Sequence, residues 1–125
     1  MRDAVDALTG EAECTLVTRG RTSGEPRAIT IWFAAVGRTV YLLSGGGEAA
    51  HWVRNLRADP AVAVIAGGVR VEGRARVIAP DEPDDTIARE AIAAKYGSTG
   101  LKTWLRTSLP VAIDLEDEPR VTDPG

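Results

Sequence analysis

The sequence is poor in the side chains that build reactive centres. Among 125 residues, Cys14 is the only cysteine and His51 the only histidine. One cysteine excludes an internal disulfide and a cysteine-rich metal site, and no G-x-S-x-G motif or cysteine–histidine pairing indicates a nucleophilic triad. We therefore expect no metal centre, and any redox or transfer chemistry would come from a bound cofactor.

Long apolar runs are also missing. No stretch of about 18 apolar residues occurs, which predicts no membrane-spanning helix. The acidic start of the chain lacks the apolar core of a signal peptide, so we expect a cytoplasmic protein. Neither glycine cluster lies in a strand–loop–helix unit of a parallel sheet, which excludes the P-loop and dinucleotide-binding motifs.

The net charge of −3 is divided unevenly along the chain. Nine arginines and four acidic residues lie from Arg19 to Arg76, whereas ten acidic and five basic residues follow from Ile78 onward. This basic middle indicates an anionic ligand, although charges on the outer faces of strands would give the same count. Arg70, Arg74 and Arg76 form a one-sided stripe, but without interleaved aromatic residues it predicts no nucleic-acid partner.

Hydrophobic alternation predicts six short strands, over 13–18, 27–35, 39–43, 61–66, 69–77 and 110–115. Helical spacing is found over 2–10, 48–58, 84–95 and 101–105. The short connections predict an antiparallel barrel in the α+β class, with a short helix inserted between strands and further helices near the C-terminus.

Residues 1–125 are expected to form a single cofactor-binding domain, with 116–125 as a loose tail. A core of this size is small for enclosing a cofactor, so burial against a second subunit, in a homodimer, would help. Gly73 interrupts the apolar face of the strand predicted over 69–77, which indicates a bulge or a close backbone approach.

Two glycine-punctuated turns are candidate anion sites. In the first, Arg21 and Arg27 flank Thr22, Ser23 and Gly24. A hairpin here would direct two guanidinium groups and two hydroxyls at one phosphate, a geometry that the planar arginine fork suits. A solvated polar hairpin is the alternative.

The second turn is the run 44–47, which leads into the helix predicted over 48–58. Free backbone N–H groups ahead of a helix N-terminus favour an oxyanion, although a flexible loop would need the same glycines. Within the helix, His51 could orient a ligand or donate a proton and Trp52 could stack on a planar ring; purely structural roles are the alternative. Trp32 and Trp104 have the same two interpretations.

Three segments in order resemble the deazaflavin-dependent nitroreductase family. Residues 20–27 (GRTSGEPR) are similar to its G-R-x-S-G-x-x-R segment, and residues 44–60 are similar to its S-x-G-G…W-x-x-N-L-x-A-x-P segment. Residues 104–111 (WLRTSLPV) resemble its W…R-T-x-P-V segment, so that the match spans about residues 15–115. The resemblance implies a split β-barrel related to the pyridoxamine-phosphate-oxidase fold, and it implies coenzyme F420, a flavin analogue with a phosphate and a glutamate tail.

The resemblance also assigns cofactor-binding roles by position. The phosphate and the anionic tail would be held by Arg21, Thr22, Ser23 and Arg27. The edge of the deazaflavin ring would be lined by Ile29, Thr30, Ile31 and Trp32. The polar rim of the ring would be contacted by Ser44 and Gly45, and the pocket would be closed by His51, Trp52 and Asn55.

Two positions depart from the family pattern. Gly45 stands where related members often have a lysine. Of a run of tyrosines over the substrate site, one of which serves some members as a proton donor, only Tyr96 has a counterpart here, with Thr99 and Lys102 at neighbouring positions.

The reaction implied by the resemblance is hydride transfer from the reduced deazaflavin to an electron-poor small molecule, such as a quinone, a nitro compound or an activated alkene. Ser44, Tyr96 or a bound water would supply the accompanying proton. Two alternatives stay open: an FMN-binding reductase of the same fold, and a non-catalytic carrier of a flavin or another small ligand.

Overall fold

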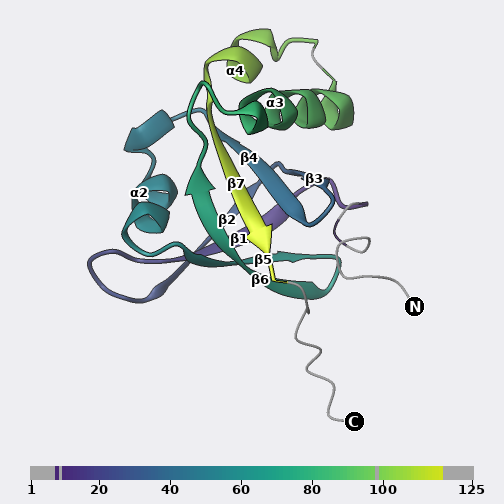
Figure 1. Ribbon diagram of the computed structural model, residues 1–125. Coiled ribbons are helices and arrows are strands. Elements are labelled where there is room, and N and C mark those ends of the chain that lie inside the picture. The colour runs from purple at the N-terminus through teal and green to yellow at the C-terminus, as the bar shows by residue number, and fades with distance from the viewer. Residues whose placement is uncertain (1–7, 9, 98, 117–125) are drawn as a thin grey trace.

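A computed structural model of the chain describes residues 8, 10–97 and 99–116, and its centre is one curled antiparallel sheet (Figure 1). The seven strands are β1 (Cys14–Arg19), β2 (Pro26–Ile31), β3 (Ala34–Val36), β4 (Thr39–Ser44), β5 (Ala61–Ala66), β6 (Val69–Val77) and β7 (Leu109–Leu115). The predicted α+β fold with an antiparallel split barrel is confirmed.

Helices cover two sides of the sheet. After a 3₁₀ turn over Gly47–Ala49, helix α2 (His51–Ala58) packs against β1 and β6, at the left in Figure 1. Helix α3 (Pro83–Tyr96) packs on β3, β4 and β7, and the short α4 (Lys102–Thr107) lies beside it. Within the described ranges, no helix combines the length and the apolar character that a membrane crossing requires.

The strand order explains the curl of the sheet. Neighbouring strands follow the order β2-β1-β5-β6-β7-β4-β3, and every pairing is antiparallel. β2 and β3 therefore form opposite edges, yet only Trp32 and Phe33 separate them along the chain. Because the three-residue step from Ile31 to Ala34 spans no more than about 11 Å, the edges must come close together, and the sheet closes into a half-barrel.

This crossing divides the strand predicted over 27–35, which is why the structure has seven strands instead of six. The backbone of Phe33 leaves the sheet and bonds to the Tyr96 hydroxyl, which accepts from its N–H at 3.0 Å and lies 2.9 Å from its carbonyl oxygen. The Phe33 side chain has no exposed surface and anchors the crossing in the core. The residues from Ile31 to Val36 are all apolar, so no change in the sequence pattern reveals the break.

Other predicted elements are found at or near their expected places. The strands over 61–66 and 69–77 have the predicted limits. The helix predicted over 48–58 is divided, since α2 begins only at His51. Of the predicted helix 2–10, only buried Leu8 and Gly10 are described, and of the predicted tail only Glu116 is described.

The main core lies inside the curl of the sheet and contains Leu16, Leu42, Val64 and Ile113, none of which has exposed surface. Gly73 faces this core on β6. A β-carbon there would lie 2.7 Å from Cγ2 of Ile113 and 3.0 Å from the carbonyl oxygen of Asp114. The glycine therefore marks a close approach of β6 to β7.

The single cysteine is part of the same core. Cys14 has 3% of its surface exposed, and burial raises the pKa of its thiol to about 12. Because only the thiolate reacts with disulfide reagents, we expect no reaction of the folded protein with Ellman's reagent at pH 8 and stoichiometric reaction in concentrated guanidinium chloride. Rapid labelling of the folded protein would contradict this placement.

Candidate functional site

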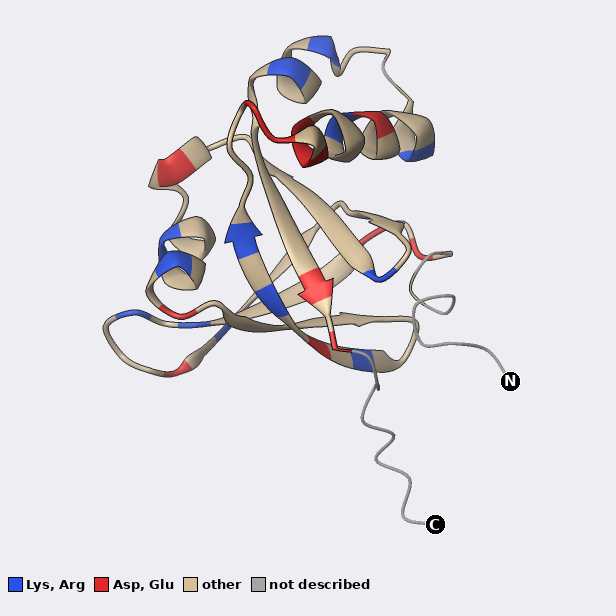
Figure 2. Cartoon of the chain, in the orientation of Figure 1, with Lys and Arg blue, Asp and Glu red and all other residues tan. Residues whose placement is uncertain are grey.

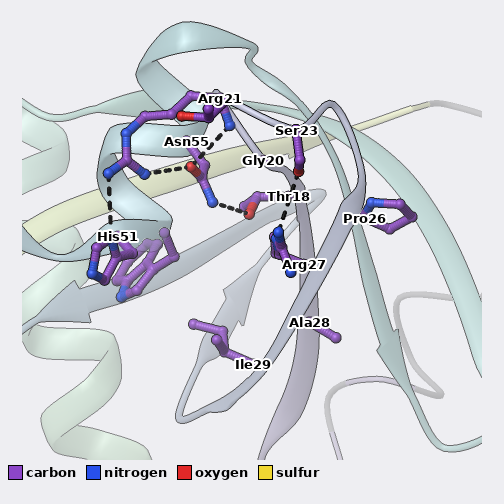
Figure 3. Close-up of a pocket in the computed structure, with 12 residues that line it drawn as sticks. Thr18, Gly20, Arg21, Ser23, Pro26, Arg27, Ala28, Ile29, His51 and Asn55 are labelled. Atoms are coloured by element: carbon purple, nitrogen blue, oxygen red, sulfur yellow. Dashed lines mark hydrogen bonds between the residues drawn. The ribbon is translucent and has the colours of Figure 1, made fainter.

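The candidate site is a cleft of about 670 Å³ between the β1–β2 hairpin and helix α2 (Figure 3). Its volume is typical of small-molecule pockets, which span roughly 300–1,000 Å³. The residues that line it are Thr18, Gly20, Arg21, Thr22, Ser23, Pro26, Arg27, Ala28, Ile29, His51, Trp52 and Asn55.

The hairpin is held closed by two short backbone hydrogen bonds. The N–H of Gly20 donates to the carbonyl oxygen of Glu25, and the N–H of Gly24 donates to that of Gly20, each at 2.8 Å. Gly24 has φ +73°, a left-handed conformation that glycine adopts without strain. Gly20 is buried, and a β-carbon there would lie 2.7 Å from Oγ of Ser23. These glycines let the turn fold tightly over its own side chains.

Ser23 and Arg27 are paired across this turn. The Ser23 hydroxyl oxygen accepts from the backbone N–H of Glu25 at 3.1 Å and from the Arg27 guanidinium at 3.3 Å. Arg27 itself is exposed. The turn thus holds a cation at the mouth of the cleft.

Arg21 is held from the opposite side by helix α2. Its guanidinium donates to Oδ1 of Asn55 at 2.7 Å and contacts Nδ1 of His51 at 3.3 Å (Figure 3). Because a guanidinium only donates, this contact is a hydrogen bond when Nδ1 of His51 carries no proton and accepts. His51 and Asn55 are four residues apart and therefore share one face of the helix.

The charges of Arg21 and Arg27 are not neutralised within the part of the chain that the structure describes. Figure 2 shows basic residues on α2 and on the β1–β2 hairpin. Four other arginines between residues 19 and 76 form ion pairs with carboxylates: Arg19, Arg57, Arg70 and Arg76. Arg21 and Arg27 bond only to neutral groups there, so the cleft carries positive charge that is available to an anion.

Unlike Arg21 and Arg27, two arginines of the predicted stripe on β6 form ion pairs. Arg70 pairs with Glu72, and Arg76 pairs with Asp114, Asp84 and Glu82. Hydrogen bonding to Asp114 and Asp84 raises the pKa of Arg76. The ion pairs of Arg76 with Asp114 and Asp84 join β6 to β7 and to α3, and the Arg70 pair lies within β6. Two of the three arginines in the stripe are therefore engaged within the fold.

Eight of the predicted site residues meet at the cleft: Arg21, Thr22, Ser23, Arg27, Ile29, His51, Trp52 and Asn55. The structure does not bring the other six to its lining: Thr30, Ile31, Trp32, Ser44, Gly45 and Tyr96. Two of these six, Thr30 and Ile31, are on β2 next to Ile29. Ile29 and Ile31 point toward the core, whereas Thr30 is exposed on the opposite face. Ile31 lies one pleat beyond the cleft.

The glycine loop is arranged around buried Ser44. The Ser44 hydroxyl donates to the carbonyl oxygen of Gly47 at 3.1 Å, which closes the loop. A β-carbon at Gly45 would lie 3.4 Å from the indole of Trp104. This loop therefore lies close to Trp104, one of the aromatic residues described next.

Three aromatic side chains gather where the chain crosses from β2 to β3. The rings of Trp32 and Tyr96 are stacked, with centroids 4.3 Å apart, and Trp104 meets Trp32 edge-on at 5.9 Å. Trp32 remains 39% exposed. The cluster thus offers an exposed indole that directly follows the strand with Arg27 and Ile29.

Four cleft residues were not among the predicted site residues: Thr18, Gly20, Pro26 and Ala28. A signal for Thr18 was present in the sequence. In the strand predicted over 13–18, Cys14, Leu16 and Thr18 alternate on one face, so a polar residue occupies the last inward position, next to the turn.

One sequence family matches almost the whole chain. The sequence model described as F420H(2)-dependent quinone reductase matches residues 3–116. No curated protein matches the sequence significantly.

Solved structures share the fold at low sequence identity. A conserved hypothetical protein from Mycobacterium tuberculosis has a TM-score of 0.73 at 21% identity, over 93% of this chain and 81% of that one. An F420-H2 dependent reductase, FDR-A, has a TM-score of 0.67 at 22% identity, over 85% and 95%. A protein described as a pyridoxamine 5'-phosphate oxidase from Listeria innocua has a TM-score of 0.64 at 18% identity, over 90% of each chain. These likenesses place the chain in the split-barrel fold.

Proposed function

The chain belongs to the F420H(2)-dependent quinone reductase family, and from this premise we propose that its cleft binds coenzyme F420 and that a quinone is its electron acceptor. The family match confirms the resemblance found in the sequence and makes the protein an F420-dependent reductase. The cofactor's place in the cleft, the acceptor and the role of each residue are our proposals.

The observation that carries the proposal is the pair of unneutralised arginines. Arg21 and Arg27 face a cleft whose other polar groups are hydroxyls, an amide and an imidazole. An anion there would gain charge-assisted hydrogen bonds without displacing a carboxylate. The phosphate and glutamate tail of F420 supply that negative charge, so the cleft fits the anionic part of the cofactor.

We propose that the ring of the cofactor lies toward Ile29 and Trp32, away from the arginines. β2 leads from Arg27 past Ile29 to Trp32, and polar residues give way to apolar ones in that direction. Trp32, Tyr96 and Trp104 supply flat apolar surface at that end. The predicted contacts of Trp32 and Gly45 with the ring remain part of this proposal.

When bound and reduced, F420 supplies a hydride from its ring carbon to the acceptor. The chain itself would orient the two partners and exclude water from between them. The two predicted proton donors have their hydroxyl protons engaged: Ser44 donates to Gly47, and Tyr96 lies against the carbonyl oxygens of Ala12 and Phe33 at 2.5 and 2.9 Å. Burial also raises the pKa of Tyr96. We therefore propose that water supplies the accompanying proton.

Replacing Tyr96 with phenylalanine separates these roles. Without the hydroxyl, the Phe33 N–H loses its acceptor, so we expect a loss of about 1–3 kcal/mol in the free energy of unfolding and a turnover number within about threefold of the parent. A catalytic acid would contribute about 10²–10⁴-fold to the rate. A fall of that size at unchanged stability would make Tyr96 the donor.

A homodimer remains part of the proposal. Much of the cleft lining is exposed in the single chain, including Arg21, Thr22, Ser23 and Arg27. A second subunit over this side would exclude water from the cofactor. Light scattering coupled to gel filtration should give twice the mass of one chain.

The proposed function is tested by mixing the protein with reduced F420 under anaerobic conditions and adding one acceptor at a time. Return of the oxidised deazaflavin fluorescence should be fastest with a quinone and slower with a nitro compound or an activated alkene. Reduced FMN serves as the cofactor control. Tight FMN binding without F420 binding would favour the flavin alternative, and F420 binding without turnover of any acceptor would favour the carrier.

A further inference from the structure

We propose that Thr18 and Asn55 are positioning residues that fix Arg21 relative to Arg27, and that they act on the ligand through Arg21 instead of touching it. The functional part of this inference rests on the proposed binding of F420 in the cleft. The geometry that it requires can be tested on the protein without any cofactor.

Asn55 uses both ends of its amide within the protein. Its Oδ1 accepts from the Arg21 guanidinium at 2.7 Å and from the Arg21 backbone N–H at 3.3 Å. Its Nδ2 donates to Oγ1 of Thr18 at 3.2 Å. Asn55 is only 5% exposed. An amide that is bonded at both ends and buried to this degree holds its neighbours in place.

Thr18 connects this arrangement to the sheet. It is 2% exposed, and its hydroxyl is the acceptor for Asn55. On β1, Thr18 lies directly opposite Arg27 of β2 in the strand register. One residue is therefore linked to both arginines, to Arg27 through the ladder and to Arg21 through Asn55 (Figure 3).

The consequence is preorganisation of two cations. A free arginine side chain samples many rotamers, and ordering it on binding costs affinity. With Asn55 holding both its backbone and its guanidinium, Arg21 is already ordered before the ligand arrives. The neutral amide also leaves the charge of Arg21 available, whereas an aspartate at position 55 would neutralise it at the same distance.

The geometric part is tested by hydrogen exchange of the cofactor-free protein. Thr18→Val keeps the side-chain shape and removes the acceptor for Asn55. We expect the Arg21 backbone amide to exchange about three- to tenfold faster, as for loss of one hydrogen bond, while Thr18→Ser stays at the parent rate. Amides of β7 serve as the folding control. Unchanged exchange at Arg21 in Thr18→Val would overturn the inference.

The functional part is tested by a double-mutant cycle with F420 binding as the readout. Thr18→Val should weaken binding about three- to tenfold when Arg21 is present and by less than about twofold in an Arg21→Ala background. Equal losses in both backgrounds would mean that Thr18 does not act through Arg21. Asn55→Asp should weaken binding about as much as Arg21→Ala, because it neutralises the same charge; parent affinity in Asn55→Asp would count against the inference.

The two experiments also distinguish a failure of this inference from a failure of the proposed function. If the parent protein fails to bind F420, the proposed function fails, and the exchange experiment still decides whether Thr18 and Asn55 position Arg21. If F420 binds and the cycle is additive, the proposed function stands and the positioning role fails.

Discussion

Replacing Arg21 or Arg27 with alanine should weaken F420 binding by about 1.5–3 kcal/mol, or roughly 10- to 150-fold, because each change removes hydrogen bonds from a cation to the anionic part of the cofactor. The double variant should lose more than either single variant. Fluorescence titration of oxidised F420 into each protein measures the effect directly, and the circular dichroism of each variant should match that of the parent.

Arg54→Ala is the matched control for this prediction. Arg54 is an exposed arginine on α2, does not line the cleft and has no ion pair with a carboxylate in the described part of the chain. Its removal changes the net charge by the same amount, but salt screens its field. We expect a loss below about threefold at 0.15 M salt. Parent affinity in both cleft variants, or an equal loss in Arg54→Ala, would contradict the assignment of the anion site.

Phe33→Ala should destabilise the fold by about 3–5 kcal/mol, the usual cost of removing a buried aromatic ring. The ring is fully buried where the chain passes between the two edges of the sheet, and the ammonium group of Lys95 lies 3.6 Å from its centroid. Because the side chain anchors the closure of the half-barrel, the denaturation midpoint in guanidinium chloride should fall sharply.

Two further variants serve as controls for Phe33→Ala. Phe33→Leu keeps most of the volume and should cost less than about 1.5 kcal/mol. Val36→Ala changes an apolar residue on the adjoining strand β3, but Val36 is 47% exposed, so its effect should stay within about 0.5 kcal/mol. Similar midpoints for Phe33→Ala and Val36→Ala would contradict the role assigned to Phe33.

The regular parts of the fold could be predicted because they follow from local patterns. The alternation of Val69, Val71, Ala75 and Val77 with charged residues predicts β6 to the residue, and Gly73 correctly indicates the close approach to β7. Short turns imply antiparallel neighbours, which the register confirms. The crossing at Trp32 and Phe33 could not be predicted, because it depends on Tyr96, more than sixty residues away.

The candidate site, like the fold, could be predicted only in part. The glycines, the arginines and the Trp-x-x-Asn-Leu spacing predict the hairpin and the helix that form the cleft. The positioning role that we propose for Thr18 depends on Asn55, 37 positions further along the chain, so no local pattern predicts that hydrogen bond. Likewise, Ser44 reads as a loop hydroxyl in the sequence, but in the structure it is buried and bonded to its own loop.

The most direct test of the central claim is a crystal structure of the protein with F420 bound. The proposal predicts the cofactor's phosphate or glutamate tail within hydrogen-bond distance of the guanidinium groups of both Arg21 and Arg27, with the ring toward Ile29 and Trp32. A cofactor whose anionic groups lie away from both arginines would contradict it.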